Sequence, residues 1–265
     1  MKNIISLLLF ISTLIGVSAA QDMQKLRVMT YNIHHGQGMD GRIDIARIGD
    51  IITDNKIDLA ALQEVDRGVE RTNKIDIMQM LSDQTGMFMA FGKNIDFQGG
   101  DYGNGVLSKF RLDSVNNLNY EMKREGEKRG LLKTIIKVNG ERIVFIDTHT
   151  GDKNNESEKL MNADEIIAVL KGCGNMPVIM CGDFNDRPGS KMHEKLKEYF
   201  VDICELLGND SGYSFPSVKP ERRIDYIYIS KEGLKRFKPL SITTIQTEAS
   251  DHLPVIAEFE VSDNQ

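Results

Sequence analysis

The sequence predicts an α/β fold, built from buried strands and amphipathic helices. Short apolar segments bounded by Pro, Gly or Asn indicate the strands, and segments with apolar residues three or four positions apart indicate the helices. The composition, 40% hydrophobic and 27% charged over 265 residues, is typical of a globular protein. Because no repeat or low-complexity linker interrupts residues 21–265, one domain is the simplest organisation.

The first twenty residues have the pattern of a secretory signal peptide. Met1-Lys2-Asn3 gives a positive start, residues 4–17 are almost wholly apolar, and Ser18-Ala19-Ala20 supplies small residues. We expect cleavage after Ala20 and a secreted or periplasmic mature protein without a transmembrane segment. An uncleaved anchor is the alternative, although the apolar segment is short for a membrane span.

The first part of the mature chain is expected to alternate strands and helices. Strands are predicted at 25–31 and 57–62, and helices at 42–53 and 75–84. Strands at 87–91 and 105–108 flank a glycine-rich turn at 99–103, and a weaker strand covers 112–121.

The second part begins with a hairpin. Strands at 130–138 and 142–149 surround Asn139-Gly140, a dipeptide that favours a tight hairpin turn. The elements expected after it are helices at 156–170 and 190–199 and strands at 177–181, 223–229, 240–246 and 254–261.

The segment from Pro177 to Arg187 is the most informative. Its apolar strand ends at Gly182 and is followed by Asp183, Asn185 and Asp186. An Asx-rich turn would explain this cluster by itself. However, other predicted strands also end in polar residues, and their convergence at one edge would form a single site. These residues are Asn32, Glu64, His149 and the pair Asp251-His252.

The residue types at these ends suit phosphoryl hydrolysis. Asn32, Glu64 and Asp251 offer oxygen ligands, which Mg²⁺ or Mn²⁺ prefers to the ligands of zinc sites. Such a reaction needs a metal ion, a group that orients water and donors for the phosphate.

The remaining residues supply the other groups. Asp183 can orient or deprotonate water, while Asn185, His149 and His252 can donate to phosphate or to a leaving group. Asp225 can hold His252 in the required tautomer.

Seven short motifs occur in the order of a known family. They are Thr30-Tyr31-Asn32, Leu62-Gln63-Glu64-Val65, Gly103-Asn104-Gly105-Val106-Leu107-Ser108, Asp147-Thr148-His149, Gly182-Asp183-Phe184-Asn185, Arg223-Ile224-Asp225-Tyr226 and Ser250-Asp251-His252-Leu253-Pro254. With them the chain resembles the endonuclease/exonuclease/phosphatase superfamily of deoxyribonuclease-like, metal-dependent phosphoesterases. The match covers nearly the whole mature chain.

The resemblance implies a four-layer α/β sandwich, two mixed β-sheets packed face to face with helices on the outside. It also implies the same roles for the site residues, with Glu64 as principal metal ligand, Asn32 and Asp251 near the ion, Asp183 positioning water, Asn185 and His149 holding phosphate, and His252 paired with Asp225. Some branches of the family place an acid where this chain has His34, so a second ion at this end is left open.

Several other residues allow two interpretations. Arg67, Arg71 and Arg129 can bind substrate phosphate, or they can form solvated salt bridges such as Arg67 with Asp66. Asn104 is either a substrate-binding residue or part of a turn. The remaining histidines divide into His34 and His35, which can touch the ion or the phosphate, and His193, which is expected on a helix surface.

The sequence therefore predicts a secreted, Mg²⁺-dependent phosphoesterase that acts on a phosphodiester or phosphomonoester. An exported nuclease acting on DNA or RNA is the alternative, but the net charge of −6 disfavours it because nonspecific nucleic-acid binding needs several cationic contacts. A non-catalytic binding protein is the competing class. We expect a monomer with buried thiols, and a bridge between Cys173 and Cys204 is left open.

Overall fold

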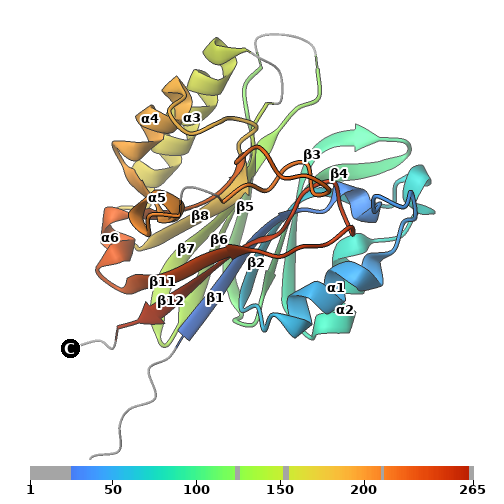
Figure 1. Cartoon of the computed structure of the whole chain (residues 1–265), viewed down its shortest axis with the longest axis horizontal. Coiled ribbons are helices and arrows are strands. Elements are labelled where there is room, and N and C mark those ends of the chain that lie inside the picture. The colour runs from blue at the N-terminus through green and yellow to red at the C-terminus, as the bar shows by residue number, and fades with distance from the viewer. Residues whose placement is uncertain (1–24, 123–125, 152–154, 210–211, 263–265) are drawn as a thin grey trace, which may run out of the picture.

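Two six-stranded β-sheets pack face to face, with helices covering their outer surfaces (Figure 1). This computed structural model describes residues 25–122, 126–151, 155–209 and 212–262. The predicted signal peptide, residues 1–20, lies outside the described residues. The arrangement confirms the four-layer α/β sandwich.

The first sheet has the strand order β11-β12-β1-β2-β4-β3. Its strands β1 and β2 are parallel, and the other neighbours are antiparallel. Two helices, α1 and α2, pack on its outer face and against each other (Figure 1). The elements of this half are β1 (Lys25–Asn32), α1 (Ile45–Asp54), β2 (Leu59–Arg67), α2 (Ile77–Thr85), β3 (Phe88–Phe97), β4 (Gly100–Ser108), β11 (Phe237–Thr244) and β12 (Val255–Val261).

The second sheet has the order β5-β6-β7-β8-β10-β9, with only β7 and β8 parallel. Its outer face is covered mainly by α3 and α4 (Figure 1). The elements are β5 (Leu112–Asn119), β6 (Gly130–Val138), β7 (Glu141–His149), α3 (Glu156–Gly172), β8 (Val178–Asp183), α4 (Lys191–Lys197), β9 (Phe200–Asp202), α5 (Ile203–Leu206), β10 (Asp225–Ser230) and α6 (Lys231–Leu234).

Buried apolar side chains form three layers. The central layer lies between the sheets and includes Val28, Leu59, Phe145, Ile179 and Ile227. The other two layers join each sheet to its own helices. Each fully buried side chain of this size contributes about 1.5–3 kcal/mol relative to its exposed state, so these layers supply the main driving force for folding.

The alternation of side chains along a strand determines where the polar residues point. In β8, Ile179 and Cys181 face the opposite sheet, and Asp183 follows them on the same face two residues later. The same rule turns other strand-end residues inward toward the gap between the sheets. They are Thr30, Asn32, Gln63, Asp147, His149 and Asp225, and all are buried.

Most predicted elements are confirmed, with two kinds of difference. The hairpin around Asn139-Gly140 forms, and both residues have positive φ. The glycine-rich turn is wrong because the chain reverses at Gln98 and Gly99, and Tyr102 and Gly103 lie inside β4. The short elements β9, α5 and α6 carry too few residues to show a periodic pattern.

The predicted buried thiols are confirmed for Cys173 and Cys181. Both are free cysteines, so the bridge between Cys173 and Cys204 is not formed. Burial raises the pKa of the Cys181 thiol well above its usual value, which favours the unreactive protonated form.

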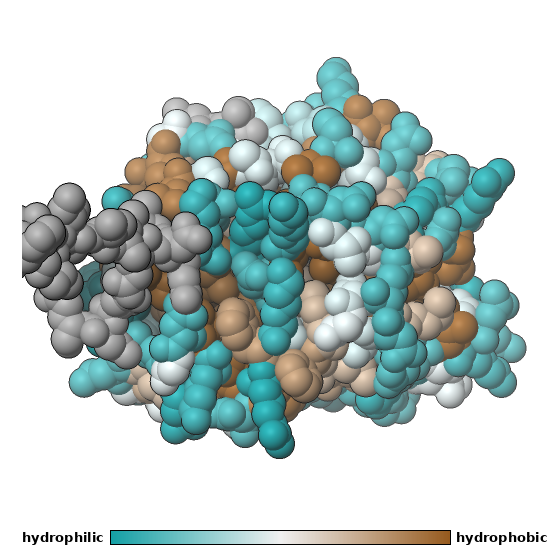
Figure 2. Space-filling view, turned by 90° about the horizontal axis from the view of Figure 1, so that it is seen from below, coloured by the Kyte–Doolittle hydropathy of each residue, from teal (hydrophilic) through white to brown (hydrophobic). Residues whose placement is uncertain are grey.

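The molecular face in Figure 2 is mainly hydrophilic, and its hydrophobic residues occur in small separate groups. Among the described residues, no helix has the length and apolarity needed to cross a membrane.

Gly182 tests the close packing of β7 against β8 beside Asp183. A Cβ atom at this position would overlap the backbone oxygen of Thr148. We expect Gly182→Ala to lower the free energy of unfolding by about 1–3 kcal/mol, measured by urea denaturation. Gly172, where a Cβ would meet open space, is the control, and Gly172→Ala should leave stability equal or higher. Equal stability of both variants would contradict this packing.

Candidate active site

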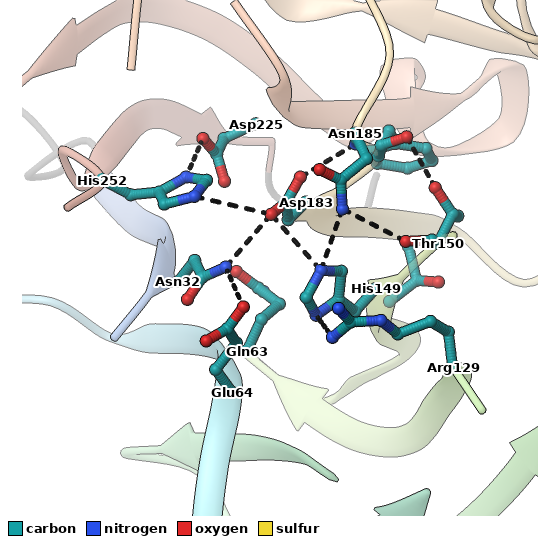
Figure 3. Close-up of polar contacts among 12 residues, drawn as sticks. Asn32, Gln63, Glu64, Arg129, His149, Thr150, Asp183, Asn185, Asp225 and His252 are labelled. Atoms are coloured by element: carbon teal, nitrogen blue, oxygen red, sulfur yellow. Dashed lines mark hydrogen bonds and ion pairs between the residues drawn. The ribbon is translucent and has the colours of Figure 1, made fainter. Parts of the chain in front are cut away.

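Most of the predicted site residues converge at one edge of the sandwich (Figure 3). The parallel pairs β1–β2 and β7–β8 bring Asn32, Glu64, His149 and Asp183 to this edge. His149 is paired with Asp183 in register, and Asp225 is paired with Asp183 from the other side. The chain thus places a carboxylate at the centre of a polar cluster built from both sheets.

The carboxylate of Asp183 is the centre of this cluster. Asn32 Nδ2 donates to its Oδ2 at 3.1 Å, and the backbone N–H of Asn185 donates to its Oδ1 at 2.8 Å. Two ring nitrogens also approach Oδ2, His149 Nε2 at 3.4 Å and His252 Nε2 at 3.7 Å (Figure 3). Asp183 is therefore fixed in one orientation by donors from four segments.

The environment makes Asp183 a weaker acid than usual. Burial, together with the negative charge of Asp225, raises the pKa of Asp183 to about 7, although His252 and the two hydrogen-bond donors oppose this. A carboxylate with a pKa near neutrality can accept a proton from water efficiently.

His252 and Asp225 form a buried pair. The Nδ1–H of His252 donates to Asp225 Oδ2 at 2.9 Å, and the Ser214 hydroxyl donates to the same oxygen. Burial lowers the pKa of His252, but the carboxylates of Asp225 and Asp183 outweigh this and raise it to about 10. His252 is therefore an imidazolium at neutral pH, with Nε2–H directed toward Asp183.

His149 has the opposite character. Its Nδ1 lies 2.8 Å from Arg129 Nη1, and because a guanidinium only donates, this nitrogen accepts and the ring proton lies on Nε2. Burial, followed by the positive charges of Arg129 and His252, holds the pKa of His149 well below its usual value. His149 is a neutral donor beside a charged one.

Asn185 lies just beyond the end of β8. Its φ of 48° is in the left-handed region, which Asn adopts more readily than other non-glycine residues. The side-chain amide donates to the Thr150 carbonyl at 3.2 Å and lies 3.0 Å from His149 Nε2. The preceding Phe184 is buried among Tyr226 and Tyr228, and it anchors the loop.

Glu64 lies at an irregularity in β2. The register between β2 and β4 shifts from Leu62 to Val65, and Glu64 has a φ of 60°. Asn32 Nδ2 donates to Glu64 Oε1 at 3.1 Å, so the Asn32 amide joins Glu64 to Asp183. Backbone strain of this kind costs about 1–3 kcal/mol and is typical of functional positions.

Two histidines complete the surroundings of Glu64. Ligand atoms of His34, His35 and Glu64 all lie within 4.8 Å of one another. The carbonyl of Gln37 accepts from His34 Nδ1 at 3.3 Å, which leaves Nε2 of this ring available. The buried Nδ1 of His35 has no hydrogen-bond partner in the described part of the chain. This donor set fits a divalent cation, and its two imidazoles depart from the all-oxygen ligand set that Mg²⁺ prefers.

Asp251 also lies close to His34. Its Oδ1 lies 3.3 Å from the Ser250 hydroxyl oxygen and 3.9 Å from His34 Nδ1. The Ser250 hydroxyl donates its one proton to the Asn32 carbonyl at 2.7 Å, which ties this loop to the end of β1. Asp251 is thus near the predicted ion site through His34, although it is not part of the group formed by His34, His35 and Glu64.

The predicted cationic residues are placed differently from one another. Arg67 pairs with Asp101 rather than with Asp66, and Arg71 takes the buried Asp66 through two hydrogen bonds of 2.8 and 2.9 Å. Arg129 supports His149 and also donates to the Tyr102 hydroxyl. Substrate binding by Arg67 and Arg129 stays a prediction.

Two expectations about polar residues need correction. Asn104 is not in a turn but inside β4, where it donates to the Gly130 carbonyl and accepts from Asn94. His193 is not a surface residue, because it is buried and bonded to Tyr228 and Glu205. Substrate binding by Asn104 stays a prediction.

Sequence reasoning missed a buried layer beneath the site. Gln63 Nε2 donates to Asp147 Oδ1 at 2.6 Å and thereby joins the two sheets. Burial raises the pKa of Asp147 well above its usual value, which favours the neutral form of this carboxyl, although the hydrogen bond from Gln63 opposes the shift. Thr150 and Ser214 were also missed. Gln63 and Asp147 could have been found, because the alternation of side chains along β2 and β7 turns both residues toward the other sheet.

The comparison with protein families agrees with this geometry. The family model described as Endonuclease/Exonuclease/phosphatase family matches residues 29–252, from β1 to the site histidine His252. The chain belongs to the endonuclease/exonuclease/phosphatase family. Members of this family are hydrolases that act on phosphoester bonds.

Similar proteins span nearly the whole family domain. Uncharacterised protein YbhP of Escherichia coli K12 is 25% identical over 249 residues, which cover 89% of this chain and 96% of that protein. A family protein from Leptotrichia buccalis has a TM-score of 0.73 at 20% identity, covering 90% of this chain and all of that one. A mannosyl-6-phosphatase from Bacteroides thetaiotaomicron has a TM-score of 0.67 at 18% identity, covering 88% and 99%. The two structures share the fold.

The His252–Asp225 pair predicts a dependence of stability on pH. Because the folded-state pKa of His252 is raised from 6.5 to about 10, its stabilisation is complete below pH 6.5 and is lost as the pH rises through 10. Between pH 7 and 10 the unfolding free energy of the metal-free protein should fall by roughly 1 kcal/mol per pH unit from this group.

The variant Asp225→Asn should reduce that slope, measured by urea denaturation across the pH range. Asp54→Asn, at the exposed end of α1, is the control and should keep it. Equal slopes in wild type and Asp225→Asn would show that His252 is not charged by this pair.

Proposed function

We propose that this protein is an exported phosphoesterase that uses Mg²⁺ or Mn²⁺ and cleaves a phosphodiester or phosphomonoester by attack of water on phosphorus. Membership of the family supports a phosphoester as the bond that is cleaved. The observation that carries the proposal is Asp183, a buried carboxylate with its pKa near 7 between a neutral and a charged histidine.

Asp183 is suited to orient the attacking water and to take its proton. Its two oxygens are held by Asn32 and by the Asn185 backbone, so the carboxylate cannot rotate away from an incoming water. Since the pKa of Asp183 is about 7, its ionised form is well populated at neutral pH.

Three donors are placed to bind the phosphate oxygens. The Asn185 amide, the Nε2–H of neutral His149 and the imidazolium of His252 surround the same carboxylate (Figure 3). Positively charged His252 would stabilise negative charge that develops on phosphorus oxygens or on the leaving group. Arg129 keeps the proton of His149 on Nε2, and Asp225 keeps His252 charged.

Glu64, with His34, His35, Asn32 and Asp251 around it, would hold the divalent ion. When bound, the ion would neutralise charge on the phosphate and favour attack by water. The strained backbone of Glu64 directs its carboxylate toward the histidines without help from substrate.

Export is proposed from the signal-peptide pattern of residues 1–20. A monomer is proposed as the working state. An exported nuclease stays the alternative enzyme, and cleavage of plasmid DNA in the same assay distinguishes it from an enzyme for small phosphate esters.

The variant Asp183→Asn tests the catalytic proposal. Wild type with Mg²⁺ or Mn²⁺ should hydrolyse p-nitrophenyl phosphate or bis-p-nitrophenyl phosphate, and the variant should lose about 100-fold or more in kcat. Asp54→Asn should retain the wild-type rate. Negligible and equal rates for wild type and Asp183→Asn on every ester, with either ion, would exclude the enzyme.

The variant Glu64→Gln tests the ion site without relying on activity. Calorimetric titration of the apo protein with MnCl₂ or MgCl₂ should give weaker binding by about tenfold or more, because the carboxylate that is grouped with His34 and His35 is neutralised. The exposed Glu70→Gln is the matched control. Unchanged affinity in Glu64→Gln would place the ion elsewhere.

A further inference from the structure

A hollow of about 530 Å³ lies beside the catalytic cluster. It is formed by the start of α3, the loop that follows β8, the start of α4 and the segment before β10. Asn185 belongs to both places, since its side chain contacts His149 in the catalytic cluster and it also lines the hollow. A substrate held at Asn185 would therefore extend into this space.

The lining of the hollow is cationic in an acidic protein. Four cationic side chains, Lys159, Arg187, Lys191 and Arg222, face two carboxylates, Glu156 and Asp186, which leaves a net charge of +2. The whole chain carries −6. Such a local reversal of charge attracts an anionic ligand.

The positive charges of Lys159 and Lys191 are already balanced by carboxylates within the hollow. Lys191 pairs with Glu156 at 2.7 Å. Lys159 is 7% exposed, donates to the Asn185 carbonyl at 2.6 Å and lies 3.5 Å from Asp186. Lys159 thus fixes the backbone of the loop after β8 at Asn185 and balances the negative charge of Asp186.

The two arginines supply the excess charge. Among the residues that the structure describes, no side chain or carbonyl accepts a hydrogen bond from the guanidinium of Arg187 or of Arg222. Arg222 lies over the ring of Phe215 at 4.3 Å, and both arginines are exposed. Their guanidinium donors are available to a ligand.

The hollow and the catalytic cluster are also connected through Phe215. One contact of this ring is with Arg222, and another is with His252, whose ring centroid is 4.7 Å away. Arg222 is therefore positioned relative to the charged histidine by a rigid aromatic ring, as a specificity-determining residue would be.

We infer that this hollow binds a second anionic group of the substrate, so that the preferred substrate is a small organic molecule with two phosphate groups. Arginine recognises phosphate through paired donors, and the volume is within the range of small-molecule sites. The inference rests on the proposed phosphoesterase function for the first phosphate. A compact hollow in an acidic protein fits a small bisphosphate better than nucleic acid, which needs an extended basic surface.

The double variant Arg187→Gln/Arg222→Gln tests the inference by binding rather than by turnover. The probes are fructose 1,6-bisphosphate and fructose 6-phosphate, which differ by one phosphate, titrated calorimetrically into the chelator-treated protein. Wild type should bind the bisphosphate more tightly than the monophosphate, and the double variant should lose about tenfold or more of that preference. Arg111→Gln, at the opposite end of the second sheet, should preserve it.

Three results would overturn the inference. The first is equal affinity of wild type for fructose 1,6-bisphosphate and fructose 6-phosphate. The second is an unchanged preference for the bisphosphate in the double variant. The third is a double variant that loses affinity for a single-stranded DNA oligonucleotide, titrated in parallel, but not for the bisphosphate. Hydrolysis of p-nitrophenyl phosphate, measured separately, reports on the proposed function. A wrong inference about bisphosphate binding in the hollow is thereby distinguished from a wrong proposal of phosphoesterase activity.

Discussion

The hydrogen bond from Asn32 to Asp183 is the interaction on which the site depends, because it joins the two sheets at the point where the chemistry is proposed. A buried carboxylate is costly unless donors surround it. Here β1, the loop after β8 and the histidines of two further segments supply them. The packing of one sheet on the other therefore sets the geometry of the proposed site, and the hydrogen bond from Gln63 to Asp147 beneath it supports the same spacing.

The second physical feature is the opposite protonation of two histidines close to one carboxylate. His149 is kept neutral by burial and by the guanidinium of Arg129, whereas the carboxylate of Asp225 keeps His252 charged despite its burial. Environments that separate the pKa values of neighbouring groups divide acid, base and donor roles among them. The supporting residues Arg129 and Asp225 are thus as important to the proposed chemistry as the residues that would touch phosphate.

Much of this arrangement is predictable from the sequence, for physical reasons. Short apolar segments mark β1, β7 and β8, and because side chains alternate along a strand, polar residues in phase with the inward apolar ones face the other sheet, which locates Asn32, His149 and Asp183. Contacts between distant segments are not encoded locally. The pairing of Asp66 with Arg71 instead of Arg67 depends on tertiary packing that no periodicity reveals. The same is true of the burial of His193 against Tyr228.

The central claim is that water held by Asp183 attacks phosphorus, and isotope incorporation tests it most directly. Hydrolysis of a phosphomonoester by the metal-loaded protein in H₂¹⁸O should place one ¹⁸O atom in the released inorganic phosphate and none in the alcohol, as determined by mass spectrometry. Label in the alcohol would mean cleavage of the carbon–oxygen bond. That result would contradict a site in which every donor surrounding Asp183 is arranged for attack at phosphorus.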